Sequence, residues 1–214
     1  KQSGSLIFWF KEFLDKVGHD KATLIMHTDV KDSHGQDLEA IIHELGLIKG
    51  EILFSTLKIG APDLSMMYNM GDVTINISDA EGFGLATLES LSCGTPILVN
   101  MTGGLQEQVT DGENWFGIGL EPASKSIIGS QEVPYIYEDR LNKEDFLNAL
   151  MEFYEMGREK RRELGLAGRE FVQKRFNFED FSSQWDKTLT DFHEKWGSWD
   201  TRKGYQKYEF KEIV

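Results

Sequence analysis

Four short hydrophobic runs, separated by stretches of helical periodicity, constrain the fold of this chain more than any other feature. The runs do not alternate with polar residues, which is typical of strands that are buried on both faces. They cover residues 22–28 (ATLIMHT), 52–56 (ILFST), 72–78 (DVTINIS) and 96–100 (PILVN). Helical stretches lie between them at 37–45, 62–70 and 84–92. This order predicts the α/β class, a Rossmann-like parallel sheet with helices on both faces.

The alternation of hydrophobic runs and helical stretches ends by about residue 121. Residues 121–141 contain two Pro, several Ser and no clear period, which indicates a long loop or insertion. Asn142 is suited to cap a helix, a second helix is expected over 159–174, and a third begins near Asn177. The third helix has an apolar stripe that should be buried, formed by Phe178, Phe181, Trp185, Leu189, Phe192 and Trp196. The aromatic tail after it adds Trp199, Tyr205, Tyr208 and Phe210.

Net charge and cysteine content narrow the classes of function. The 214 residues include 23 Lys and Arg against 36 Asp and Glu, a net charge of −13 that argues against nucleic acid or an acidic membrane as a partner. One Cys and scattered His leave no metal-ligand spacing, so we expect no metal site and a reducing compartment. No run is long enough to span a bilayer and no signal peptide is evident. We therefore expect a soluble, cytoplasmic protein.

A glycine-rich turn joins the third hydrophobic run to the helix that follows it. Gly82 and Gly84 lie in this turn, where glycine allows the backbone to approach a ligand closely. The amides of the first helical turn and the helix dipole are suited to a phosphate group. The alternative is that these glycines serve only a tight turn, and the turn alone does not decide between the two.

The distribution of charge favours a ligand site. Of the 25 residues from 82 to 106, Glu89 alone is charged, although at 28% charged residues about seven would be expected. No Lys or Arg lies three or four residues away to pair with it. Glu89 is about 7.5 Å along the helix from Gly84, a spacing that suits a ribose if a diphosphate binds at the helix N-terminus. A merely surface-exposed Glu89 is the alternative.

These residues resemble a known donor-site motif. The segments EGFGLATLE (81–89), CGTP (93–96) and TGGLQE (102–107) closely resemble that of retaining GT-B glycosyltransferases of family 4. The resemblance covers residues 1–196 as the C-terminal, nucleotide-sugar-binding domain, with an insertion at about 121–141. It implies that the tail, 197–214, packs on an N-terminal domain that these residues do not include.

The resemblance also implies roles for individual residues. Glu89 would bind the ribose hydroxyls, and Glu81 would act as the catalytic residue beside the donor sugar. The remaining donor-binding positions are the glycine turn with its amides, the second glycine pair, and two lysines for the diphosphate and the base: Gly82, Phe83, Gly84, Leu85, Gly103, Gly104, Lys1 and Lys58. Leu57 would also lie near the base.

Such enzymes transfer a sugar from a nucleoside-diphosphate sugar, such as a UDP- or GDP-sugar, with retention of configuration. The acceptor would be a glycan, a lipid or a protein. We expect neither a cofactor nor a metal, because no Asp-x-Asp motif occurs and the helix amides can meet the diphosphate charge.

Two departures from the family pattern leave other readings open. The upstream Arg and the first, central strand are not found in these residues, so the sequence predicts a fragment of a longer polypeptide. The alternatives are a GT-B nucleotide-sugar epimerase and a non-catalytic, Rossmann-like nucleotide-binding module. The pair of Glu81 and Glu89 favours sugar transfer over the epimerase.

Overall fold

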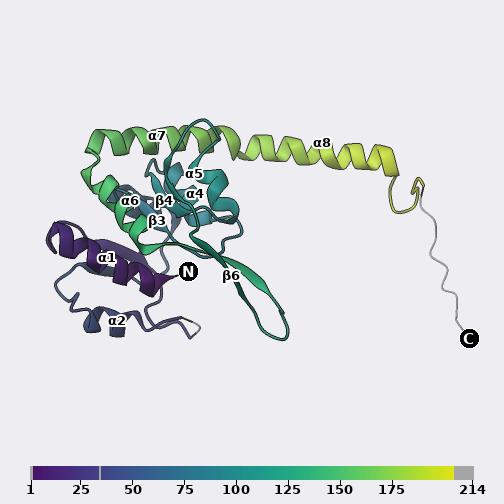
Figure 1. Ribbon diagram of the computed structural model, residues 1–214. Helices are drawn as coiled ribbons and strands as arrows, with labels where there is room; N and C mark the ends of the chain where they lie inside the picture. Colours follow the sequence, from purple (N-terminus) through teal and green to yellow (C-terminus); the bar gives the residue numbers. More distant parts are fainter. Residues whose placement is uncertain (1, 34, 205–214) are drawn as a thin grey trace, which may run out of the picture. The chain divides into compact units, whose positions relative to one another are not determined.

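The computed structural model describes residues 2–33 and 35–204, which divide into two units, Lys1–Val172 and Gln173–Val214. The first unit contains five parallel strands flanked by helices (Figure 1). One ladder joins β1 to β2, and a second joins β3, β4 and β5 in that order. The strands are β1 (Leu24–His27), β2 (Ile52–Ser55), β3 (Thr74–Asn76), β4 (Ile97–Asn100) and β5 (Gly117–Leu120). The α/β class and the parallel orientation predicted from the sequence are confirmed.

The parallel strands of the described residues form two separate ladders. Within them, β1 and β3 each form a ladder along one edge only. They nevertheless share one hydrophobic core, because Leu24 and Ile52 of the first ladder and Leu98 of the second belong to the same buried cluster. The open edges of β1 and β3 therefore belong to a single folded unit.

The helices that precede α8 agree closely with the sequence pattern. The expected helices are found with shifts of one or two residues, and α1 is a helix that the periodicity analysis did not assign. Asn142 caps α6 as predicted, its side chain accepting a hydrogen bond of 2.9 Å from the Glu144 amide. The helical elements are α1 (Ser3–Val17), α2 (Leu38–Glu44), α3 (Ala61–Met70), α4 (Leu85–Ser92), η1 (Gly103–Leu105), α5 (Gln106–Val109), α6 (Lys143–Glu155) and α7 (Arg158–Arg175).

The strand β5 was missed because its sequence contains two glycines, which lower strand propensity. The structure shows why they are there. A Cβ atom on Gly117 would lie 1.8 Å from the Ile97 carbonyl oxygen, and one on Gly119 would lie 2.4 Å from the sulfur of Met101. The glycines allow β5 to approach β4 closely.

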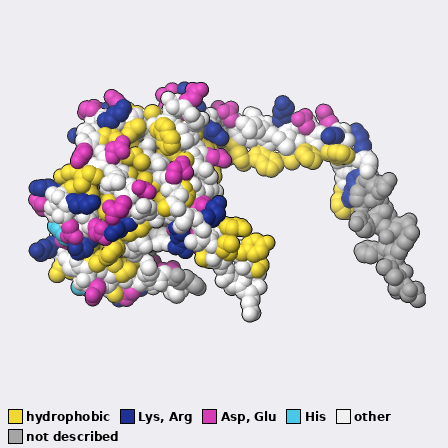
Figure 2. Space-filling model, viewed as in Figure 1, with side chains coloured by type: hydrophobic (Ala, Val, Ile, Leu, Met, Phe, Trp, Pro, Cys, Tyr) yellow, Lys and Arg dark blue, Asp and Glu magenta, His cyan; other side chains and the backbone are white. Residues whose placement is uncertain are grey.

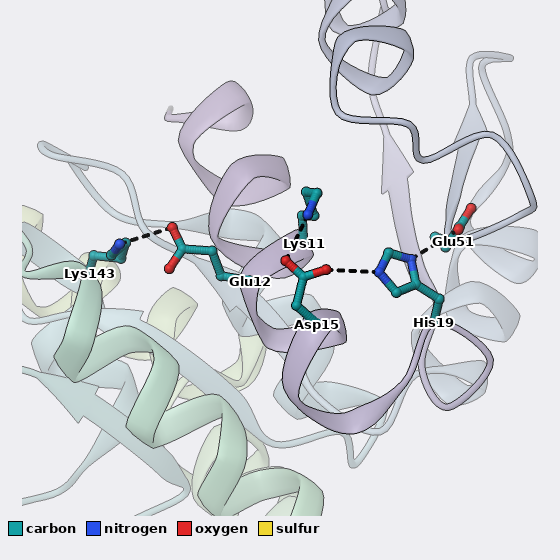
Figure 3. Close-up of polar contacts among 6 residues, drawn as sticks. All are labelled: Lys11, Glu12, Asp15, His19, Glu51 and Lys143. Carbon is teal, nitrogen blue, oxygen red and sulfur yellow. Dashed lines mark hydrogen bonds and ion pairs between the residues drawn. The ribbon is translucent and has the colours of Figure 1, made fainter.

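Helices α1 and α6 pack against each other. The Trp9 and Phe146 rings lie 5.3 Å apart between centroids, and Lys143 forms a 2.9 Å ion pair with Glu12 across the same contact (Figure 3). This packing contributes much of the core of the first unit, since both helices direct several buried side chains into it.

A charged cluster joins the end of α1 to the start of β2 (Figure 3). His19 lies 3.0 Å from an Asp15 oxygen and 3.2 Å from an oxygen of Glu51, whose side chain is only 3% exposed. The hydrogen bonds to Asp15 and then Glu51 raise the pKa of His19. Burial raises the pKa of Glu51, but backbone amides, including that of Lys49, and His19 outweigh it and lower the pKa overall.

The segment 121–141 is a β-hairpin, so the prediction of a loop is wrong there. Strands β6 (Ser124–Ile128) and β7 (Ile136–Arg140) pair in antiparallel register, with Ile127 opposite Tyr137 and Ile128 opposite Ile136. Runs of β-branched and aromatic residues on both sides of a Gly-Ser turn were the signal for it. The outer part of the hairpin exposes apolar side chains (Figure 2).

The second unit is described by itself. Its helix α8 (Phe178–Trp196) begins where predicted, with the Asn177 side chain accepting a 2.8 Å hydrogen bond from the Asp180 amide. The apolar stripe along α8 is exposed, up to 79% at Phe178, so its expected burial is not provided by the described residues (Figure 2). Trp199 is also exposed, whereas Tyr205, Tyr208 and Phe210 lie outside the described residues. Among the described helices, none has the length and apolar character needed to cross a membrane.

Candidate active site

Two glycine turns meet at the carboxyl ends of β3 and β4. A Cβ atom on Gly103, which has φ +49°, would lie 1.7 Å from the Glu81 carbonyl oxygen. The Gly104 amide donates a 3.1 Å hydrogen bond to the Gly82 carbonyl. Only glycine allows this backbone-to-backbone contact. The structure therefore brings together the two glycine segments that the sequence singled out, at the edge of the sheet where α/β proteins bind ligands.

The N-terminus of α4 has the features expected of an anion site. Gly84 precedes the helix with φ +88°, and no side chain of the described residues caps it. The first helical hydrogen bond runs from the Leu88 amide to the Gly84 carbonyl, 3.3 Å long. The preceding amides, beginning with Leu85, therefore have no α-helical acceptor. Phe83 and Leu85 are exposed, so a solute can reach this end of the helix.

A buried glutamine holds the turn in place, and the sequence analysis did not identify it. Gln108 is fully buried on α5, donates a 2.6 Å hydrogen bond to the Phe83 carbonyl and accepts one of 2.6 Å from the Thr87 hydroxyl. The Thr87 hydroxyl also lies 2.8 Å from the Gly84 carbonyl. Gln108 thus links α5 to both sides of the glycine turn. Its partners are 21 and 25 residues away, which hides the contact from any local pattern.

Glu89 has a partner that the sequence analysis did not find. Its side chain is exposed, and its Oε2 accepts a 2.9 Å hydrogen bond from the hydroxyl of Tyr68, on α3. Burial first and then the Glu89 carboxylate raise the pKa of Tyr68, so this phenol stays protonated. The search for a cation three or four residues away was therefore too narrow, because the partner is a neutral donor on the neighbouring helix.

Asp79, three residues after the end of β3, is contacted both by the residue that precedes α1 and by the hairpin. Gln2 donates a hydrogen bond to the Asp79 carboxylate, and Arg140 of β7 forms a 2.8 Å ion pair with the same group. Arg140 also pairs with Glu138. Because Asp79 lies two residues before Glu81, these contacts hold the segment that leads into the glycine turn.

The base of the hairpin is fixed to the ends of the strands. Asn100 donates a 2.7 Å hydrogen bond to the Asp139 carbonyl, and the Thr102 hydroxyl donates one of 2.7 Å to the Asp139 carboxylate. The Asp139 amide donates a 2.7 Å hydrogen bond to the Asp79 carbonyl. The hairpin is therefore anchored next to the two glycine turns, which nothing in the sequence indicated.

Of the two lysines proposed for the site, the structure describes Lys58 alone. Lys58 is exposed in the loop between β2 and α3. Lys1 lies outside the described residues, so its proposed role stays a prediction. No group of three or more His, Cys, Asp or Glu side chains within residues 2–33 and 35–204 is arranged to hold a metal ion.

Comparison with known proteins identifies related sequences. Residues 31–171 match the family model for glycosyl transferases group 1. The D-inositol 3-phosphate glycosyltransferase of Paenarthrobacter aurescens is 28% identical over 110 residues, covering 51% of this chain and 26% of that protein. This chain thus spans about a quarter of the length of the first curated relatives that it matches.

Solved structures of glycosyltransferases share the fold. Sucrose-phosphate synthase from Thermosynechococcus elongatus superposes with a TM-score of 0.63 at 24% identity, covering 86% of this chain and 42% of that protein. HepE of Anabaena, solved in complex with UDP and glucose, gives a TM-score of 0.57 at 15% identity and covers 86% of this chain and 52% of that protein. At these identities the likeness concerns the fold, which is that of GT-B glycosyltransferases.

Proposed function

Because this chain belongs to the glycosyl transferases group 1 family, we propose that it binds the nucleoside-diphosphate sugar from which a sugar is transferred. The contact between the two glycine turns carries this proposal. It places the Glu81 segment, the N-terminus of α4 and the Gly103-Gly104 turn within one small region. Chemically, that region combines helix-terminal amides for an anion with carboxylates for hydroxyl groups.

In the proposed complex, the distal phosphate accepts hydrogen bonds from the amides of Phe83, Gly84 and Leu85. Glu89 binds the ribose hydroxyls and Glu81 the hydroxyls of the sugar near its reacting carbon. A carboxylate is suited to both tasks because it accepts two hydroxyl donors at once. The base would lie near Leu57 and Lys58, in the loop after β2.

We propose that transfer proceeds with retention. The bond between the sugar and the diphosphate breaks while the acceptor hydroxyl attacks the same face of the sugar, and its proton passes to the leaving diphosphate. The amides at the N-terminus of α4 stabilise the negative charge that develops on the diphosphate, as oxyanion-hole donors do. Glu81 would hold the sugar as its reacting carbon becomes positive.

The acceptor, a glycan, lipid or protein, would require polypeptide beyond these 214 residues. Two observations support that requirement. The open edges of β1 and β3 suit a further parallel strand, since buried strand edges need hydrogen-bond partners. The exposed apolar stripe of α8 suits a second domain of the same protein.

Calorimetric titration of UDP and GDP into Glu89→Gln tests the nucleotide role. The substitution should weaken binding of the diphosphate by about 1–3 kcal/mol, the usual cost of losing a charge-assisted hydrogen bond. Glu113→Gln, which removes an exposed carboxylate in the turn before β5, is the matched control and should leave affinity unchanged. Equal affinity of Glu89→Gln and the unsubstituted chain would remove the ribose role.

Glu81→Gln tests the other half of the assignment. It should leave the affinity for the bare diphosphate unchanged and lower sugar transfer in the complete enzyme, because Glu81 is assigned to the sugar. If Glu81→Gln and Glu89→Gln weakened the bare diphosphate equally, the division between the two carboxylates would be wrong.

A further inference from the structure

Tyr68 and Glu89 form a pair that joins two helices at the edge of the site. Tyr68 lies near the end of α3 and Glu89 in the middle of α4, and their side chains meet through the 2.9 Å hydrogen bond from the phenol to Oε2. Tyr68 is half-buried, whereas Glu89 is exposed. An exposed Glu side chain normally samples many rotamers, and ordering it costs free energy. The phenol removes part of that freedom before any ligand arrives.

The backbone on both sides of the pair is tied to one buried turn. The Thr95 hydroxyl donates a 2.8 Å hydrogen bond to the Tyr68 carbonyl, which fixes the end of α3. The Thr95 amide donates a 3.0 Å hydrogen bond to the Ser90 carbonyl, and the Ser90 hydroxyl donates one of 3.0 Å to the Thr95 carbonyl. Ser90 is the residue next to Glu89, and both Ser90 and Thr95 are buried. Both members of the pair are therefore held by the same turn.

The chemistry of the Tyr68 phenol as a hydrogen-bond donor matters as much as its position. A phenol donates one hydrogen bond and carries no charge, so it occupies one acceptor site of Oε2 and leaves Oε1 available. A Lys or Arg in its place would neutralise the carboxylate and compete with hydroxyl groups for both oxygens. Burial and the neighbouring carboxylate raise the pKa of Tyr68, which keeps the donor proton in place.

We propose that Tyr68 is a positioning residue that orients Glu89 to bind the ribose hydroxyls of the nucleotide. This inference rests on the proposed function, in which Glu89 contacts the ribose. It gives α3, which lies outside the donor-site motif segments, a part in nucleotide binding through Tyr68. Without the phenol, the same carboxylate would have to be ordered at the moment of binding, which lowers affinity.

The test compares nucleotides that differ only at the ribose. NMR titrations of the 214-residue chain with UDP and GDP, up to millimolar concentration, are paired with titrations of their 2′,3′-dideoxy forms, for Tyr68→Phe, Glu89→Gln and the double variant. Tyr154→Phe, which removes an exposed phenol on α6, is the matched control. Thermal unfolding of each variant shows that it is folded.

Of UDP and GDP, the nucleotide that binds more tightly should bind about three- to tenfold more weakly to Tyr68→Phe, the usual cost of ordering one long side chain. Binding of the dideoxy form should not change. In the double variant, the loss should equal that of Glu89→Gln alone, because Tyr68 acts through Glu89. Tyr154→Phe should change the affinity for neither the ribose form nor the dideoxy form.

The outcomes separate this inference from the proposed function. If Glu89→Gln leaves the ratio of ribose to dideoxy affinity unchanged, or if neither nucleotide binds, the proposed nucleotide role itself is wrong. If Glu89→Gln lowers that ratio and Tyr68→Phe does not, the donor site stands and the positioning role is wrong. The positioning role of Tyr68 would also be overturned if Tyr68→Phe weakened binding of the ribose and dideoxy nucleotides equally, or if it made the ribose nucleotide bind more tightly.

Discussion

Replacing Gln108 by Leu should destabilise the protein through the glycine turn. The substitution removes the 2.6 Å hydrogen bond to the Phe83 carbonyl and the one from Thr87. Thr87 can still donate to the Gly84 carbonyl at 2.8 Å, so the main loss is the partner of Phe83. Losing one hydrogen bond at a buried side chain, partly offset by the apolar character of Leu, costs about 1–2 kcal/mol.

That cost should be visible in thermal unfolding. For a chain of this size, each kcal/mol lowers the melting temperature by about 2–4 °C, so a decrease of about 2–8 °C is expected for Gln108→Leu. Gln106→Leu is the matched control: Gln106 begins the same helix but is exposed, and its replacement should change stability by less than about 0.5 kcal/mol.

The consequence for binding follows from the same geometry. The turn held by Gln108 carries the amides proposed for the phosphate, so Gln108→Leu should also weaken binding of a nucleoside diphosphate, whereas Gln106→Leu should not. Calorimetry of the two variants checks this. A melting temperature of Gln108→Leu equal to that of the Gln106→Leu control would refute the view that Gln108 holds the turn.

Three further predictions concern packing, pH and metal dependence. Gly103→Ala should cost about 2–4 kcal/mol, because its Cβ would meet the Glu81 carbonyl. Gly112→Ala shares a positive φ but has open space around it, so denaturant unfolding should show a clearly smaller loss there. The pKa of His19 is raised above its unfolded value of 6.5, so its ion pairs stabilise the fold fully below that pH and are lost as the pH rises through the folded pKa. The stability difference between the unsubstituted chain and His19→Gln should therefore shrink from pH 6 to pH 8, and a constant difference would contradict this assignment. Sugar transfer by the complete enzyme should persist in EDTA, and a strict requirement for Mn²⁺ or Mg²⁺ would count against the proposed role of the α4 amides.

The hairpin illustrates where sequence reasoning failed on a whole element. The runs that form β6 and β7 are short, and the composition between them resembles a loop. Pairing of Ile127 with Tyr137, and the anchoring of Asp139 to Asn100 and Thr102, stabilise the strands. Asp139 lies 39 residues from Asn100 and 37 from Thr102, so no local pattern specifies this anchoring.

Local features of the sequence by themselves determined the α/β class, the first four parallel strands, the capped helices at Asn142 and Asn177, and the glycine turn followed by Glu89. Each depends on residues within a few positions of one another, through hydrophobic periodicity, capping or backbone freedom.

Only the tertiary structure decided which side chains face one another. It paired Glu89 with Tyr68, placed Gln108 under the Phe83 carbonyl, set Gly103 against Glu81 and divided the strands between two ladders. A Glu or Gln side chain can make the same hydrogen bonds wherever it stands in a sequence. Its partner is chosen by the way whole helices and strands pack, which brings together residues that are far apart along the chain.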